Sequence, residues 1–193
     1  SMEQWFRGLL NCSIFSNIDK VNTSNCTNLW GTFNDCRSIE ELDLSSWDTS
    51  KVTRYGSGGY NSLFYNCLKL KKISLAGWDL SSLTTKNEMF SICPALEEID
   101  MSGCIYENAP TLMSQCFKLK KVVISPEMSF AGDFFAAAYD ATGGFDGKWY
   151  LESDLKRSFT TAEAKTYIND RFRTENDSVT LVAGYGTSAY AAI

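Results

Sequence analysis

Histidine is absent from this sequence, and its absence removes several classes of active site. Ser-His-Asp catalysis, Cys-His catalysis and every metal site that uses a histidine ligand are excluded. The carboxylates, which could act without histidine, do not cluster along the chain. We therefore expect a protein that is not an enzyme and has neither a cofactor nor a metal site.

Excess positive charge and long apolar runs are absent as well. The chain has 18 Lys and Arg against 23 Asp and Glu, a formal net charge of −5. Nucleic acid is therefore not an expected partner, because phosphate neutralisation needs a basic face. No apolar run approaches the roughly 20 residues that cross a bilayer, so we expect no membrane insertion. No signal peptide is recognisable, and Ser1-Met2 is typical of a cloning remnant, so we expect that a leader was removed.

The seven cysteines include no C-x-x-C motif. Five of them follow one another at intervals of 24, 31, 26 and 23 residues: Cys12, Cys36, Cys67, Cys93 and Cys116. This spacing places them at one position of successive motif copies, where they would form a column and not converge on a metal. An odd number cannot pair completely within the chain. We interpret them as buried, small apolar residues, with a disulfide between neighbouring copies as the alternative.

A motif of apolar residues around these cysteines recurs along the first two-thirds of the chain. Its copies begin at Phe33, Phe64, Phe90 and Met113, with a weaker copy at Leu9. Self-similarity at this period indicates stacked repeats, and the L-x-x-L-x-L part predicts short parallel strands centred on Asp43, Ser74, Asp100 and Val123. The expected fold class is an α/β repeat solenoid, a short leucine-rich-repeat stack of parallel strands with a small C-terminal α/β cap.

Charged pairs lie between the apolar positions and alternate in sign from copy to copy: Glu40-Glu41, Lys71-Lys72, Glu97-Glu98 and Lys120-Lys121. Stacked strands would set opposite charges side by side. Each exposed pair contributes only ~0–1 kcal/mol, so we expect the main effect on strand register, with a charged binding stripe as the alternative. Trp47 and Trp78 occupy an apolar position of the motif, which favours core residues over an exposed sugar or peptide platform.

An insertion distinguishes one copy from the others. Eleven residues separate Thr53 from Phe64, whereas six separate the equivalent positions of the next copy, and the extra residues lie around Tyr55–Tyr60. Loops carry function more often than the elements that they connect, and tyrosine flanked by glycine is favoured in binding loops. We hypothesise that Tyr55 and Tyr60 are aromatic anchors of a contact surface that includes the outward strand residues Asp43, Ser74 and Asp100. The alternative is a tolerated insertion.

The repeat ends near Ser125, which predicts an array of about five copies over residues 1–125 and a capping region over residues 126–193. In the capping region we expect strands at 148–151 and 179–182, and a helix or irregular cover at 128–139. Thr160 and Glu163 form a capping-box pattern that predicts a helix extending to about Arg173.

The unit F-x-x-C-x-x-L-x-x-L-D-L-S-x-W-D-T-S-x-V-T, read from Phe33 to Thr53, resembles the BspA-like leucine-rich-repeat family of bacterial surface proteins. The resemblance covers about residues 9–125, and residues 147–150 with the following helix are similar to the short Trp-Tyr module that follows such arrays. It implies a non-catalytic adhesion module that binds a protein or glycan partner and is extracellular or on the cell surface. The alternative is a structural component of a larger assembly, such as a virion, tail or fibre protein.

Overall fold

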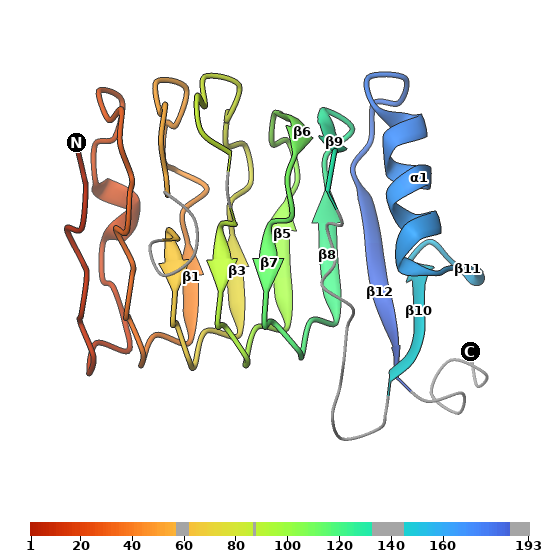
Figure 1. The fold of residues 1–193 in the computed structure, drawn as a ribbon, viewed down its shortest axis with the longest axis horizontal. Coiled ribbons are helices and arrows are strands. Elements are labelled where there is room, and N and C mark those ends of the chain that lie inside the picture. The colour runs from red at the N-terminus through yellow and green to blue at the C-terminus, as the bar shows by residue number, and fades with distance from the viewer. Residues whose placement is uncertain (57–61, 87, 133–144, 186–193) are drawn as a thin grey trace.

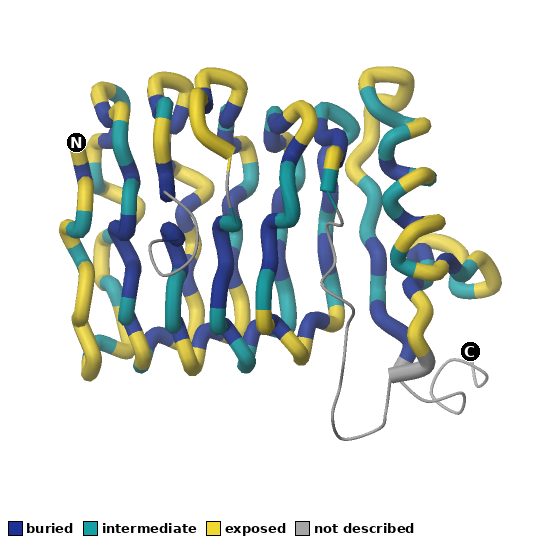
Figure 2. Tube along the Cα trace, viewed as in Figure 1, coloured by how far each residue is buried: buried dark blue, intermediate teal, exposed yellow. Residues whose placement is uncertain are grey.

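The computed structural model describes residues 1–56, 62–86, 88–132 and 145–185. Successive copies of the sequence motif lie side by side, from the N-terminus at one end to the α-helix at the other (Figure 1). Each copy runs down one limb, turns at the bottom of the view, and returns through a second limb that carries a short strand. The buried side chains lie between the two limbs (Figure 2).

Four strands form the parallel part of the main sheet: β1 (Glu41–Asp43), β3 (Lys72–Ser74), β5 (Glu98–Met101) and β8 (Lys121–Ile124). Their central apolar residues are in register, with Leu42 opposite Ile73, Ile73 opposite Ile99, and Ile99 opposite Val122. These residues are buried, whereas the outward neighbours are exposed or half-buried. This pattern is expected because successive side chains of a strand point to opposite faces of the sheet. The strands and pairings that the L-x-x-L-x-L runs predict are thus confirmed.

A second, three-stranded parallel sheet lies on the other limb, which the sequence motif did not predict. It consists of β2 (Phe64–Tyr65), β4 (Phe90–Ser91) and β7 (Met113–Ser114). The phenylalanine that opens each motif copy stacks on its equivalent in the next, with 5.4 Å between the rings of Phe33 and Phe64 and 4.9 Å between those of Phe64 and Phe90. The in-register pairing of this sheet brings the rings to stacking distance.

The expected fold class is wrong, because the C-terminal third of the chain adds strands to the main sheet. Strands β12 (Val179–Tyr185), β10 (Phe145–Leu151) and β11 (Asp154–Phe159) continue the main sheet in the order β1-β3-β5-β8-β12-β10-β11. β12 pairs antiparallel with the outer edge of β8, and β10 with β12, so these strands do not form a separate α/β cap on a parallel stack. The described residues contain one α-helix. The fold is a sheet-dominated one with a mixed seven-stranded sheet, not an α/β repeat solenoid. The division at residue 125 stays a prediction.

Helix α1 (Thr161–Arg171) begins as predicted, since Thr160 Oγ1 accepts from Glu163 N and Glu163 Oε2 accepts from Thr160 N. Its buried residues are Ala164 and Ile168. The helix packs on β9 (Met128–Phe130), which pairs in parallel with β6 (Tyr106–Ala109). The segment 128–139 therefore starts as a strand, not as a helix, and residues 133–139 lie outside the described residues.

The first motif copy begins at Phe6, three residues before Leu9, where the sequence pattern predicted its start. Phe6 stacks on Phe33 with 5.3 Å between the rings, and Cys36 Sγ donates to Phe6 O as Cys67 Sγ donates to Phe33 O. Phe6, not Leu9, is therefore the equivalent of Phe33. Gly8 has a φ of 74°, and the equivalent residues of the later copies share the left-handed conformation: Asp35, Asn66, Ile92 and Gln115. The first copy also contains η1 (Ile18–Lys20), a 3₁₀ helix.

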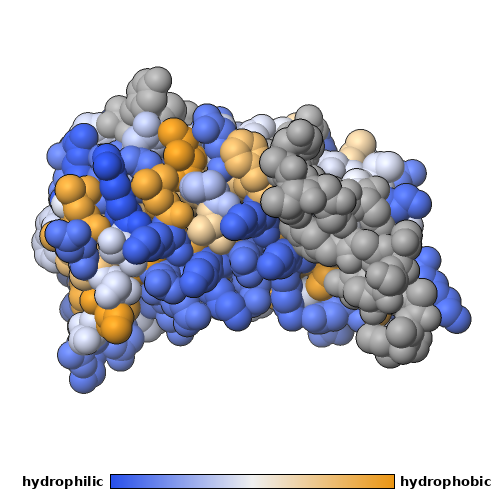
Figure 3. Space-filling model, turned by 90° about the horizontal axis from the view of Figure 1, so that it is seen from below, coloured by the Kyte–Doolittle hydropathy of each residue, from blue (hydrophilic) through white to orange (hydrophobic). Residues whose placement is uncertain are grey.

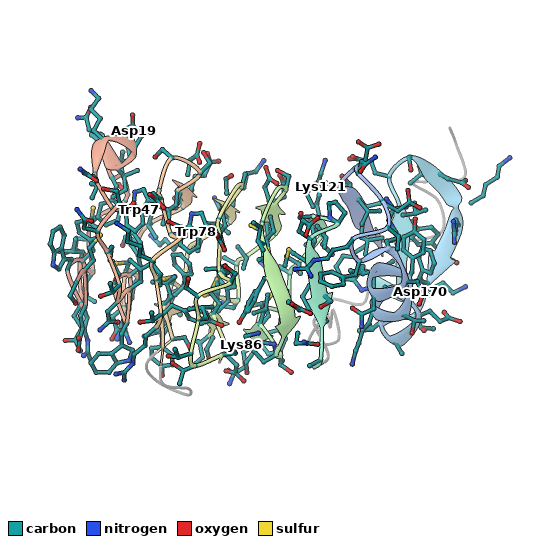
Figure 4. The ribbon with its side chains drawn as sticks, turned by 90° about the horizontal axis from the view of Figure 1, so that it is seen from above. Asp19, Trp47, Trp78, Lys86, Lys121 and Asp170 are labelled. Carbon is teal, nitrogen blue, oxygen red and sulfur yellow. The ribbon has the colours of Figure 1, made fainter. Side chains whose placement is uncertain are left out.

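The cysteine column and the two tryptophans lie largely in the core. Six of the seven cysteines are buried, all seven are free thiols, and Cys12 is half-exposed because the shift of the first copy moves it out of the column. Trp47 and Trp78 are buried and lie one behind the other, with 6.4 Å between rings inclined by 8° (Figure 4). Their indole N–H groups donate to the carbonyls of Ile18 and Leu44. The core interpretation is thus confirmed for the tryptophans and for every cysteine but Cys12.

Candidate functional site

The outward side chains of β1, β3, β5 and β8 form one exposed surface, here called the sheet face. A groove of about 470 Å³ runs over it and crosses all four strands. Asp43, Ser74 and Asp100 form a row in this groove, because the three residues are opposite one another in the parallel register. Neighbouring strands are ~4.8 Å apart, so the row repeats hydrogen-bonding groups at about that interval.

A turn after each strand holds the residues of this row in place. Asp43 Oδ1 accepts from Ser45 N at 3.0 Å, and Asp100 Oδ1 accepts from Ser102 N at 2.9 Å. Ser74 Oγ accepts from Ala76 N at 3.4 Å in the same position. One carboxylate oxygen of each aspartate is thus used to fix the side chain, and neither aspartate has a further hydrogen-bond partner among the described residues. The row is a set of positioned acceptors.

Charged side chains of alternating sign line one side of the groove. Lys72 Nζ lies 3.0 Å from Glu98 Oε1, and Lys121 Nζ lies 2.7 Å from Glu152 Oε1. The hydrogen bond to Glu98, followed by the charge of that carboxylate, raises the pKa of Lys72. These ions are exposed, and each pair contributes only ~0–1 kcal/mol. The sequence predicted the alternation but not Glu152, which comes from the turn between β10 and β11.

A second ladder of ion pairs runs beside the first, as the paired spacing of the charges predicted. Lys71 Nζ lies 2.7 Å from Glu40 Oε2, and Lys120 Nζ lies 3.1 Å from Glu97 Oε2. The hydrogen bond between Lys71 and Glu40 lowers the pKa of Glu40 and raises that of Lys71. The charges of the ladder therefore neutralise one another locally, and the residues available for recognition are those of the central row.

Tyr55 is buried, so its predicted role as an exposed aromatic anchor is corrected. Its side chain is 1% exposed, and its hydroxyl lies 2.8 Å from the hydroxyl of Tyr106, which is itself fully buried. Burial raises the pKa of Tyr106, and the neighbouring Tyr55 adds to the shift. Tyr55 lies two residues after Thr53, and its ring fills the core at that point. Tyr60 lies outside the described residues.

The sheet face and the Tyr55–Tyr106 pair lie on different sides of the molecule. Lys86 Nζ lies 5.5 Å from the centroid of the Tyr106 ring, and Figure 4 shows Lys86 on the side opposite Lys121, a residue of the sheet-face groove. The structure therefore brings together Asp43, Ser74 and Asp100, but it does not bring Tyr55 to them. No sequence signal separated the buried tyrosine from an exposed one, since both are compatible with a glycine-rich insertion.

Four of the six buried thiols are poor nucleophiles. Burial raises the pKa of Cys36 and of Cys104 to about 12, and the pKa values of Cys93 and Cys116 are also raised. Because the thiolate is the reactive form, these side chains stay protonated and unreactive at neutral pH. Within the described parts of the chain, no group of three or more Cys, Asp or Glu side chains is arranged to hold a metal ion.

Comparison with known proteins places the repeat region in a family. The family model described as "Mycoplasma protein of unknown function, DUF285" matches residues 1–122. No curated protein and no solved structure gave a significant match. Among the described residues, no helix has the length and apolar character that crossing a membrane would require.

Proposed function

The chain belongs to the DUF285 family, and from that premise we propose that it is a non-catalytic binding module whose recognition surface is the sheet face. The observation that carries this proposal is the groove with its row of positioned acceptors, Asp43, Ser74 and Asp100. A surface of this kind recognises hydrogen-bond donors that repeat at the strand spacing. Sugar hydroxyls and the N–H groups of a polypeptide are both donors of the kind that these acceptors can bind.

The proposed setting is that of a BspA-like surface protein, extracellular or on the cell surface, with adhesion to a protein or glycan as its role. The motif from Phe33 to Thr53 supports this setting, and the family assignment agrees with it at the coarser level. Reaction chemistry has little support, because histidine is absent and the pKa values of the buried thiols of Cys36 and Cys104 are raised.

The test is a binding screen against glycans and host proteins, followed by variants of the row. Asp43→Asn with Asp100→Asn removes both charges but retains the Oδ1 acceptors that fix the turns, and Ser74→Arg fills the centre of the groove. We expect each to weaken binding at least tenfold, which corresponds to about 1.4 kcal/mol. Asp48→Asn is the matched control, since Asp48 also accepts from a backbone N–H two residues on but does not line the groove. Wild-type affinity in both row variants would refute the proposal.

A further inference from the structure

The free edge of β1 is an open end of the main sheet. Glu40 O accepts from Lys71 N at 2.7 Å, and Leu44 N donates to Ser74 O at 2.9 Å, so the backbone groups of Glu40 and Leu44 point toward β3. Because successive residues of a strand alternate, the backbone groups of Glu41 and Asp43 point the other way. No backbone hydrogen bond joins them to the N-terminal segment, and β1 is the terminal strand in the order of the sheet.

A groove lies along this edge, between β1 and the N-terminal segment 13–18. Its volume is about 530 Å³, and we call it the edge groove. One wall carries the apolar side chains of Ile14, Phe15 and Ile18, and Ile14 is 75% exposed. The other wall carries the acidic side chains of Glu40, Glu41 and Asp43, and no basic side chain lines the groove. Figure 3 shows apolar side chains gathered on the N-terminal half of the underside of the molecule.

The neighbours of β5 in the main sheet indicate which kind of strand pairs with an acidic strand such as β1. Residues 97–100, which lead into and include most of β5, read Glu-Glu-Ile-Asp. β5 lies between β3 and β8, and a Lys-Lys pair spans the start of each of these strands. Residues 40–43, which include β1, read Glu-Glu-Leu-Asp, nearly the same, but β1 has such a strand on one side alone. No salt bridge joins Glu41 to any described residue, and Ile14 lines the same groove as Glu41.

We propose that the edge groove binds an extended polypeptide segment of the pattern Lys-Lys-apolar, which adds to β1 as a further parallel strand. Its backbone would bond to Glu41 and Asp43, its lysines would pair with the acidic wall, and its apolar side chains would contact Ile14 and Phe15. This is recognition by strand addition, in which backbone hydrogen bonds give affinity and side chains give specificity. The proposal does not rest on the proposed function, because the two sites share Asp43 but the edge groove needs neither Ser74 nor Asp100.

A second folded copy of the chain is a poorer occupant. Its Lys-Lys strands β3 and β8 are paired on both edges. Its free basic edge is β11, which carries Lys156 and Arg157, but α1 packs beside that strand. Residues of segment 13–18 line the edge groove together with β1, so a single extended chain is a better fit there than a strand with a helix attached.

The test uses a synthetic peptide with the sequence of residues 69–75, Lys-Leu-Lys-Lys-Ile-Ser-Leu, and a control in which the two adjacent lysines are glutamates. Binding to the intact protein is followed by NMR, with amide exchange read residue by residue. We expect the basic peptide to bind at least tenfold more tightly than the acidic one and to protect the amides of Glu41 and Asp43. Binding should weaken in 1 M salt, because exposed charges are screened.

Variants then test the site. Glu41→Lys should reverse the preference between the two peptides, and Ile14→Lys should weaken binding of the basic peptide at least tenfold by supplying the missing cation. Ile14→Gln is the control for the loss of the apolar side chain, and it should weaken binding of the basic peptide less than Ile14→Lys does. Asp100→Asn should leave peptide binding unchanged, since Asp100 lines the sheet-face groove but not the edge groove, and this separates the two sites.

Three results would overturn the proposal. The first is absence of binding at millimolar peptide, or amides of Glu41 and Asp43 that are already protected in the free protein, which would mean that segment 13–18 covers the edge. The second is peptide binding that leaves the exchange of these two amides unchanged. The third is self-association that Lys156→Glu abolishes, which would identify a second copy as the occupant.

Discussion

Replacing Tyr55 by phenylalanine removes one hydroxyl from the buried Tyr55–Tyr106 pair and leaves the other in place. The two oxygens are 2.8 Å apart, and the side chains are 1% and 0% exposed. In Tyr55→Phe the Tyr106 hydroxyl, which has no other hydrogen-bond partner among the described residues, remains buried. Leaving such a group unsatisfied costs about 1–3 kcal/mol. We expect the free energy of unfolding to fall by that amount.

The double variant Tyr55→Phe/Tyr106→Phe separates this cause from a general loss of packing. Removing both hydroxyls leaves no orphaned group at Tyr106, so the double variant should be no less stable than Tyr55→Phe alone. The measurement is urea unfolding of wild type, both single variants and the double variant, with m required to stay constant. Tyr167→Phe, which removes a partly buried hydroxyl 3.3 Å from Arg171, is the control and should cost less.

Two results would refute the reasoning: a Tyr55→Phe effect below about 0.5 kcal/mol, or a double variant whose loss equals the sum of the single losses. Truncation to Tyr55→Ala tests the burial itself. Deleting a large buried aromatic side chain costs about 3–5 kcal/mol, which corresponds to a fall in Tm of roughly 6–20 °C for a chain of this size. An exposed anchor would leave Tm nearly unchanged.

Three further predictions follow from the core and the helix. Cys67→Ser should lower stability by about 1 kcal/mol in urea unfolding, because the serine hydroxyl can still donate to Phe33 O but is more costly to bury; a stabilised variant would contradict this. Thr160→Ala should cost about 1 kcal/mol through loss of the N-cap, with lower helical circular dichroism on heating, whereas Thr160→Ser should be close to wild type. The pKa values of Cys36 and Cys104 are about 12 in the folded protein, above the ordinary value of 9.0. The contribution of these two protonated thiols to stability is therefore complete below pH 9, and it is lost between about pH 9 and 12, where the thiols of the unfolded chain lose their protons first. Stability should fall above pH 9 by up to about 1.4 kcal/mol per pH unit for each thiol, and Cys36→Ala with Cys104→Ala should flatten that slope.

Local sequence determined those parts of the fold that depend on a short pattern. The L-x-x-L-x-L runs predicted the parallel strands and their pairing, because alternation of apolar residues decides which side of a strand is buried. The capping box at Thr160 predicted the start of α1, since both of its hydrogen bonds join residues three apart. The alternating charge pairs predicted neighbouring ions of opposite sign, because equal spacing from the strand centres places them side by side.

Tertiary structure alone decided the features that depend on contacts between distant residues. The main sheet became mixed because β12 pairs with the free edge of β8, 55 or more residues away in sequence, and no motif in either strand specifies that partner. Tyr55 became a core residue because Tyr106 lies opposite its hydroxyl, a contact across 51 residues. The first copy took its register from ring stacking on Phe33, and not from the cysteine spacing that the later copies share. A row such as Asp43, Ser74 and Asp100 could be predicted, because the repeat sets its spacing. The position of Tyr55 relative to that row could not be predicted, because long-range packing determines it.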